Sequence, residues 1–186
     1  GTSASDLSSS ANDERDGVTN KGSYYVHSVS LVRLQPETKY YFEVYSGDSI
    51  YEGFNVTTFA TLSTPPSYVS ITGTVSNMPD TGEGILIAYI KDGDSTGTSG
   101  DSMPISTTLD EDGKWILSIA DSRSSDGSEY YEYTSSDTMY FSVVSTIPTV
   151  SPVSVSMNGI TSKEVAVPLE YSTSTTVTKL SDYGVI

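Results

Sequence analysis

The apolar residues of this chain alternate with polar ones in short runs, and this pattern constrains the fold more than any other feature. Tyr40, Phe42 and Val44 recur at every second position of residues 39–45, and residues 24–31 alternate in the same way. Period-two alternation places apolar side chains on one face of a β-strand. No long run of helix-forming residues at helical period accompanies it. The sequence therefore predicts an all-β protein.

Further runs of strand-forming residues follow along the chain, separated by Gly, Pro, Asp and Ser, which favour turns. The continuous apolar run at residues 85–90 indicates a strand buried on both faces. Asp112 and Gly113, between two such runs, indicate a β-hairpin. Strands at this spacing are typical of β-sandwiches. The expected strands after the first two are residues 54–59, 68–75, 85–90, 105–109, 114–119, 139–145, 153–157, 164–169 and 175–180.

Residues 62–67 are the best candidate for a domain boundary. Two consecutive prolines there favour a stiff, extended spacer. We therefore expect one domain in residues 1–61 and a second in residues 68–170. Residues 171–186 follow the expected second domain and are rich in strand-forming residues, which makes this tail a candidate donor strand for another domain.

The composition excludes several classes of partner. The formal net charge is −15, from 9 basic and 24 acidic residues. Nucleic acids and anionic membrane surfaces are recognised through Lys and Arg, so neither is an expected partner. No apolar run approaches the roughly 18 residues that a membrane helix needs, so we expect no membrane insertion. The chain has no Cys, which excludes disulfides and thiolate metal sites and is compatible with a prokaryotic surface protein.

A longer pattern runs through the first alternating segments. Leu34, Pro36, Thr38 and Tyr40 form a Leu-x-Pro-x-Thr-x-Tyr sequence. The apolar or aromatic positions on either side of it are His27, Val29, Leu31, Phe42 and Val44. This run resembles the tyrosine corner and flanking strands of fibronectin type III domains. The resemblance implies that Leu34 enters the core, that Pro36 turns the chain, and that the Tyr40 hydroxyl binds backbone upstream of it.

The resemblance covers about residues 1–60 and only the last three strands of such a domain, called E, F and G. The opening Gly1-Thr2-Ser3 is similar to the stretch that follows strand C, so strands A, B and C have no counterpart here. A three-stranded remnant would expose an inner face and unpaired strand edges. We expect either a longer parent chain or strands from elsewhere to complete this domain.

The second domain carries shorter matches. Residues 71–75, 84–89 and 107–115 resemble segments of bacterial carboxypeptidase-regulatory-like and Ig-like modules. The resemblance implies a second Ig-like β-sandwich that acts as a non-catalytic spacer. Together the two halves predict two tandem Ig-like or fibronectin-III-like sandwiches, the first incomplete. Trp115 is the only tryptophan, and we expect it to anchor the second core rather than to stack on a ligand.

No catalytic constellation is recognisable. His27 is the only histidine, and we expect it to be structural. A Ser-His-Asp triad would need this histidine, yet no Gly-x-Ser-x-Gly motif accompanies it. Zinc hydrolases normally use several histidines. We find no phosphate-binding glycine motif either.

Clustered aspartates are the one candidate metal site. Asp92, Asp94 and Asp101 lie in one predicted loop, and Asp110 and Asp112 in a turn. Calcium takes six to eight oxygen ligands, which loops between strands can supply. The spacing does not match an EF-hand. The alternative is that these aspartates are solvated turn residues. Calcium is the one candidate cofactor.

We therefore expect a non-catalytic structural or adhesive segment of an extracellular or cell-surface protein, of prokaryotic type. Its partners would be proteins, including copies of itself. Two alternatives stay open. The chain could be a subunit of a pilus-like filament assembled by β-strand complementation, or an accessory module of a secreted hydrolase.

Overall fold

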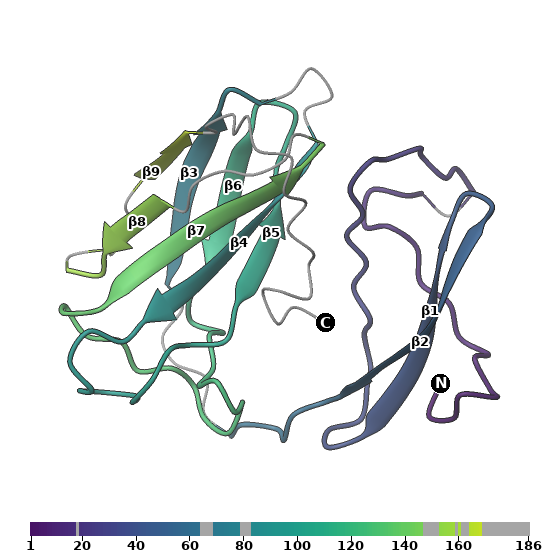
Figure 1. Cartoon of the computed structure of the whole chain (residues 1–186), viewed down its shortest axis with the longest axis horizontal. Coiled ribbons are helices and arrows are strands. Elements are labelled where there is room, and N and C mark those ends of the chain that lie inside the picture. The colour runs from purple at the N-terminus through teal and green to yellow at the C-terminus, as the bar shows by residue number, and fades with distance from the viewer. Residues whose placement is uncertain are drawn as a thin grey trace. The chain divides into compact units, whose positions relative to one another are not determined.

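A computed structural model describes residues 1–17, 19–63, 69–78, 83–146, 153–158, 160 and, for the backbone, 164–168. These residues divide into two compact units. The first comprises Gly1–Ser23 and His27–Thr61, and the second comprises Tyr24–Val26 and the described residues from Leu62 onward. All regular elements of the described chain are β-strands (Figure 1), so the all-β fold class is confirmed. We find no helix among the described residues with the length and apolarity needed to span a bilayer.

The first unit contains one antiparallel hairpin, formed by β1 (Lys39–Ser46) and β2 (Ser49–Thr57). A two-residue turn joins the strands, and Gly47 has the positive φ of 56° that such a turn favours. The register shifts between Phe42 and Val44, where β2 carries one extra residue. β2 begins at Ser49, five residues before the start of the strand expected at residues 54–59.

The strand predicted at residues 24–31 is wrong, because the structure has no regular element there. The backbone of this segment is bound by carboxylates instead of a neighbouring strand. Tyr25 N and Val26 N donate to Glu83, and Ser28 N donates to Asp13. Alternation alone cannot make a strand when no partner strand offers a ladder of hydrogen bonds.

The contact expected of Tyr40 is present. Gln35 N donates a hydrogen bond to the Tyr40 hydroxyl oxygen at 2.8 Å. Leu34, expected in a core, is only half-buried, as is Tyr40. The described residues of the first unit contribute no side chain to the set of buried apolar residues.

The second unit is built from two sheets. The first has the order β6-β3-β9, with β3 and β6 antiparallel and β3 and β9 parallel. The second has the order β5-β4-β7-β8 and is antiparallel throughout. The strands are β3 (Ser70–Ser76), β4 (Gly84–Lys91), β5 (Ile105–Thr108), β6 (Lys114–Ser118), β7 (Thr138–Ser145), β8 (Val153–Ser156) and β9 (Glu164–Pro168).

The two sheets share one apolar core. Alternate residues of β3, β6 and β7 are buried, and their neighbours in the sequence are more exposed. Trp115 of β6 is 3% exposed, and its ring centroid lies 5.5 Å from that of Phe141 in β7. The expectation that Trp115 anchors this core is confirmed. In β4, Leu86, Ala88 and Ile90 line the core, and Ile87 is buried on the opposite face.

The predicted hairpin around Asp112 and Gly113 is wrong. β5 pairs with β4 and β6 pairs with β3, so the turn between β5 and β6 carries the chain from one sheet to the other. Gly113 has a φ of 76°, and its carbonyl oxygen accepts a hydrogen bond from Val75 N at 2.8 Å. The Asp-Gly turn is therefore real, but it connects two layers instead of two paired strands.

Several expectations fall wholly or partly outside the described residues. Of the linker at residues 62–67, only Leu62 and Ser63 are described. The tail at residues 171–186, with its expected strand at residues 175–180, is not described.

Replacement of Gly113 by alanine tests this crossing turn. A Cβ at position 113 would lie 2.4 Å from the Val75 carbonyl oxygen, in addition to the unfavourable φ. We expect Gly113→Ala to lower the free energy of unfolding by about 3 kcal/mol. Urea unfolding followed by the fluorescence of Trp115 measures this, because the chain has one tryptophan.

Gly100→Ala is the matched control. Gly100 has a similar φ of 85°, but a Cβ there would meet nothing within 4 Å. We expect a loss of only about 1 kcal/mol from backbone strain. Equal losses in the two variants would show that the approach to Val75 is unimportant.

Candidate functional site

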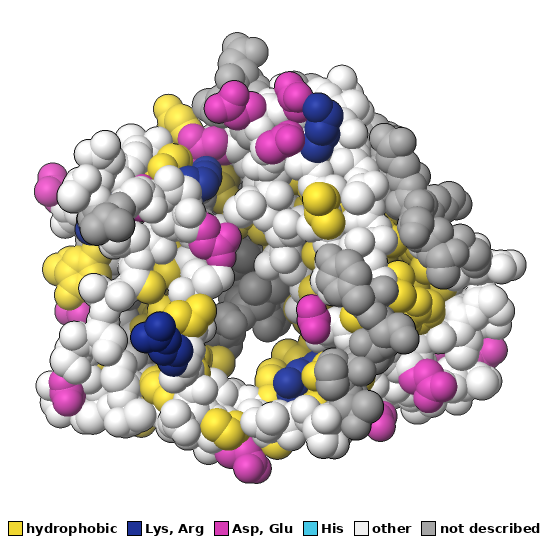
Figure 2. Space-filling view, turned by 180° about the vertical axis from the view of Figure 1, so that it is seen from behind, with side chains coloured by type: hydrophobic (Ala, Val, Ile, Leu, Met, Phe, Trp, Pro, Cys, Tyr) yellow, Lys and Arg dark blue, Asp and Glu magenta, His cyan; other side chains and the backbone are white. Residues whose placement is uncertain are grey.

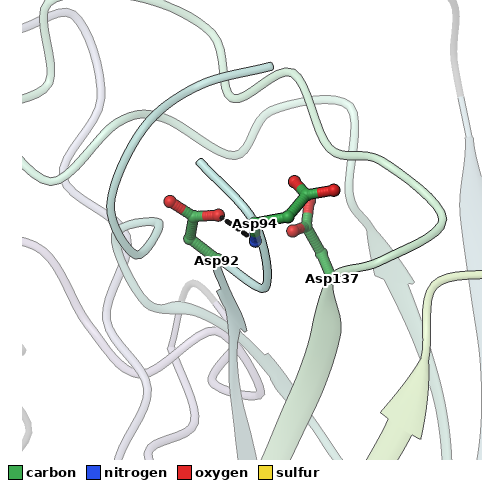
Figure 3. Close-up of side chains that lie close together, drawn as sticks. All are labelled: Asp92, Asp94 and Asp137. Atoms are coloured by element: carbon green, nitrogen blue, oxygen red, sulfur yellow. Dashed lines mark hydrogen bonds between the residues drawn. The ribbon is translucent and has the colours of Figure 1, made fainter. Parts of the chain in front are cut away.

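Three carboxylates meet at one end of the β4–β7 pair. Asp92 follows β4 and Asp137 precedes β7, and the pairing of Lys91 with Thr138 brings these strand ends together. Asp94 approaches from the loop after β4. One oxygen from each carboxylate lies within 4.8 Å of the others, and Figure 3 shows the carboxyl groups of Asp94 and Asp137 side by side.

Backbone N–H groups of the same loop bind two of these carboxylates. Asp92 accepts from Asp94 N and Ser95 N through Oδ1, at 3.0 and 2.7 Å, and from Gly100 N through Oδ2, at 2.8 Å. Asp94 accepts from Thr96 N at 3.0 Å. The hydrogen bond from Gly100 is the main cause that lowers the pKa of Asp92, and the one from Thr96 lowers the pKa of Asp94.

Asp137 is the buried member of the cluster, with 1% of its surface exposed. Its carboxylate accepts from Gly93 N at 2.9 Å and from Thr134 N at 2.7 Å. Its carbonyl oxygen accepts from Met157 N at 3.0 Å. Asp137 thus joins the loop after β4, the loop before β7 and the end of β8.

Burial and the nearby carboxylates raise the pKa of a neighbouring tyrosine, Tyr131. Tyr131 is 5% exposed, and its hydroxyl donates to the Gly100 carbonyl at 2.9 Å. Burial, followed by the charges of Asp137, Asp92 and Asp101, raises the pKa of Tyr131 to about 12. The phenol therefore stays neutral and acts as a hydrogen-bond donor that holds the loop.

The structure brings together only two of the five aspartates proposed from the sequence. Asp92 and Asp94 belong to the cluster, while Asp101 binds Asp92 N at 3.1 Å. Asp110 and Asp112 lie in the turn between the sheets. There Asp110 accepts from Lys114 N at 2.7 Å, and Asp112 forms an ion pair with the Lys114 amine at 2.7 Å. These two act as turn residues and do not join the cluster.

Sequence reasoning missed Asp137 because it lies 43 positions after Asp94. The signal that could have found it is positional. It immediately precedes a strand, as Asp92 immediately follows one. An antiparallel pairing of those two strands brings both aspartates to the same edge of the sheet.

The cluster has the oxygen ligands that calcium prefers, but it supplies three carboxylates where the ion takes six to eight oxygens. Both oxygens of Asp92 and both of Asp137 already accept backbone N–H groups. These bonds hold the loop to the ends of β4 and β7. The geometry favours a role in holding the loop.

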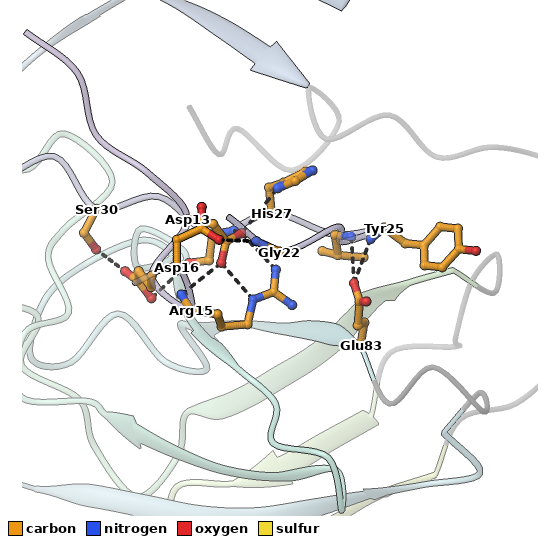
Figure 4. Close-up of polar contacts among 11 residues, drawn as sticks. Asp13, Arg15, Asp16, Gly22, Tyr25, His27, Ser30 and Glu83 are labelled. Atoms are coloured by element: carbon orange, nitrogen blue, oxygen red, sulfur yellow. Dashed lines mark hydrogen bonds and ion pairs between the residues drawn. The ribbon is translucent and has the colours of Figure 1, made fainter. Parts of the chain in front are cut away.

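A second polar arrangement, in the first unit, is centred on Asp13 (Figure 4). Its carboxylate binds Arg15 through two hydrogen bonds of 2.8 Å and accepts from Ser28 N at 3.0 Å. His27 Nδ1 lies 3.3 Å from the same carboxylate, and His27 Nε2 lies 3.5 Å from the Ser46 hydroxyl. The order Ser46, His27, Asp13 is that of a catalytic triad.

The charge of Arg15 argues against a triad. In a triad the aspartate stabilises the imidazolium that forms when histidine takes the serine proton. Here Arg15 binds both carboxylate oxygens and neutralises that charge, and the contact between His27 and Ser46 is at the limit of hydrogen-bond length. We interpret the arrangement as a polar link between residues 13–28 and the hairpin.

Comparison of this chain with family models, with curated proteins and with solved structures finds no match. The resemblances to fibronectin type III, carboxypeptidase-regulatory-like and Ig-like modules therefore stay predictions.

Removal of calcium tests the acidic cluster. Because only three carboxylates meet there and calcium takes six to eight oxygens, we expect melting curves of the second unit to coincide in about 1 mM EDTA and in about 1 mM calcium. Trp115 fluorescence reports the transition, and magnesium controls for non-specific screening. A rise of several degrees with calcium alone would establish a calcium site at Asp92, Asp94 and Asp137.

Acidification tests Asp13. The pKa of Asp13 lies well below its usual range, and the largest cause of this lowering is the hydrogen bonding of its carboxylate with the Arg15 side chain. A carboxyl whose pKa is depressed by folding contributes stability above its unfolded pKa, near 4, and loses it as the pH falls further. We expect Asp13→Asn to destabilise the first unit by about 2 kcal/mol at pH 7, with the difference shrinking below pH ~4.

Hydrogen exchange of the Ser28 amide, whose N–H binds Asp13, is the measurement. Asp6→Asn, at an exposed aspartate, is the control that should change nothing. A difference between Asp13→Asn and the native chain that persists unchanged at pH 2 would contradict the assignment.

Proposed function

We propose that this chain is a non-catalytic structural segment of an extracellular or cell-surface protein, in which the second unit bears tension as an Ig-like β-sandwich. The observation that carries the proposal is the parallel pairing of β3 with β9, the first and last described strands of that unit. Thr72 pairs with Glu164, and the register continues to Ser76 and Pro168.

This pairing decides how the unit responds to force. When parallel strands are pulled from opposite ends of their ladder, all the hydrogen bonds between them are loaded in shear together. When they are pulled from the same end, the bonds open one after another. Tension that enters before β3 and leaves after β9 acts at opposite ends of this ladder, which suits a segment that connects other parts of a long surface protein.

The surface chemistry supports an exposed, solvated setting. The chain carries a formal net charge of −15. Acidic side chains are scattered over the face shown in Figure 2, and Lys and Arg are fewer. Such a charge keeps a protein soluble and limits non-specific association. Because of this charge, we propose neither nucleic acid nor an anionic membrane as a partner.

The first unit favours a second candidate, a filament subunit completed by strands from a neighbour. Its hairpin has two strands and no buried apolar residue. Isolated hairpins are at best marginally stable in water. We propose on this ground that the unit is an incomplete sandwich of the fibronectin-III-like kind. The accessory module of a hydrolase is a weaker candidate, because no observation favours it.

Single-molecule pulling tests the load-bearing role. The chain has no Cys, so a single Cys can serve as an attachment point, with the C-terminus as the other. Thr61→Cys loads β3 and β9 in shear, whereas Ser76→Cys loads them from the same end. Both positions are exposed. We expect a severalfold higher unfolding force in the first arrangement, and equal forces would refute the load-bearing role.

A further inference from the structure

One asparagine of the hairpin stands in a sequence that accepts sugars. Asn55, Val56 and Thr57 form an Asn-x-Thr sequence whose middle residue is not proline. Exported proteins receive N-linked glycans at asparagines in such sequences. No other asparagine of the chain has Ser or Thr two positions later. The others are Asn12, Asn20, Asn77 and Asn158.

The structure places this sequence on the solvated face of the hairpin. In the ladder between β1 and β2, Asn55 pairs with Tyr41 and Thr57 pairs with Lys39. Directly paired residues share a face, and side chains alternate along a strand. All four therefore lie on the face opposite to Phe42. Both Asn55 and Thr57 are exposed.

The two side chains that a glycan-transferring enzyme must recognise are not used by the fold. Among the described residues, neither the Asn55 amide nor the Thr57 hydroxyl takes part in a hydrogen bond of the side chain. The next hydroxyl along the chain differs. Thr58 accepts from Thr38 N at 3.0 Å and donates to the Gln35 carbonyl oxygen. The hairpin thus uses Thr58 for structure and leaves Asn55 and Thr57 free to react.

The exposure of this face does not depend on how the first unit is completed. A β-sandwich has two layers, and the second layer packs against the apolar face of the first. Further strands at an edge of the hairpin extend the sheet and leave the direction of its side chains unchanged. The face with Asn55 also carries the exposed, charged Lys39, so it stays in solvent in either case.

We propose that Asn55 is a site of N-linked glycosylation. The donor is an oligosaccharide joined through C1 of its first sugar to a lipid phosphate. The amide nitrogen of Asn55 forms a bond to C1, and the bond between C1 and the phosphate oxygen breaks. The lipid phosphate leaves with the electron pair, and the nitrogen loses one of its two protons to a base of the transferase. The inference rests on the proposed function, because only an exported chain meets this enzyme.

A glycan at this position decides which face of the hairpin can contact other proteins. It is bulky and hydrated, and it would cover the surroundings of Tyr41 and Lys39. The opposite face, where the rings of Phe42 and Phe54 stack with centroids 5.4 Å apart, stays clear. Strands that complete the first unit would therefore pack on that apolar face.

Peptide mass spectrometry of the full chain, recovered from the cells that make it, tests the proposal. Trypsin cleaves after Lys39 and Lys91 and releases residues 40–91 as one peptide. We expect this peptide to exceed the mass of its sequence by that of an oligosaccharide. Fragmentation should place the oligosaccharide on Asn55 and leave Asn77 unmodified. A peptide without added mass would overturn the proposal.

Two replacements of Thr57 form a matched pair. Thr57→Ser keeps a hydroxyl at the third position of the sequence, so we expect the glycan to remain. Thr57→Val keeps the shape and the strand preference of threonine but lacks the hydroxyl, so we expect complete loss of the glycan although Asn55 is still present. Retention in both variants, or loss in both, would contradict N-linked transfer to this sequence.

A glycosidase specific for N-linked glycans tests the placement on the solvated face. We expect it to release the glycan from the folded chain about as fast as from the isolated peptide of residues 40–91. Release from the peptide alone would contradict the placement. The pulling experiment loads β3 and β9 and does not involve Asn55, so the two proposals can fail separately. A chain found at the cell surface with an unmodified Asn55 would overturn only the glycosylation.

Discussion

The packing of Trp115 against Phe141 joins the two sheets of the second unit, and the other features of that unit depend on this shared core. Once β6 and β7 face each other, the chain must cross between layers after β5, and Gly113 makes that crossing. In the sheet that contains β6, β3 and β9 are parallel neighbours. In the other sheet, the pairing of β4 with β7 places Asp92 and Asp137 at one edge.

The first unit has no such layer. A two-stranded sheet cannot bury an apolar face unless something packs against it, and no apolar side chain among the described residues of this unit is buried. The Asp13 carboxylate binds Arg15, His27 and the Ser28 backbone. Polar links hold this unit where apolar packing holds the other. That contrast is the physical basis for proposing that strands from elsewhere complete the first unit.

The sequence predicts only part of the acidic cluster. Asp92 and Asp94 are close in the sequence, and their shared loop was predicted. Asp137 could not be found by spacing, because its distance from Asp94 is set by the pairing of β4 with β7. Asp110 and Asp112 were grouped with them by residue type alone. The turn between the sheets holds them elsewhere.

The sequence by itself determined the all-β class, most of the strands of the second unit and the buried place of Trp115. Period-two alternation and turn residues are local signals, so they survive without knowledge of the partner strands. Tertiary structure alone decided that residues 24–31 form no strand, that the Asp112-Gly113 turn joins two layers, and that Asp137 completes the acidic cluster. Each of these depends on which strand lies beside which. That choice is made by burying one apolar face against another, and no short stretch of sequence encodes it.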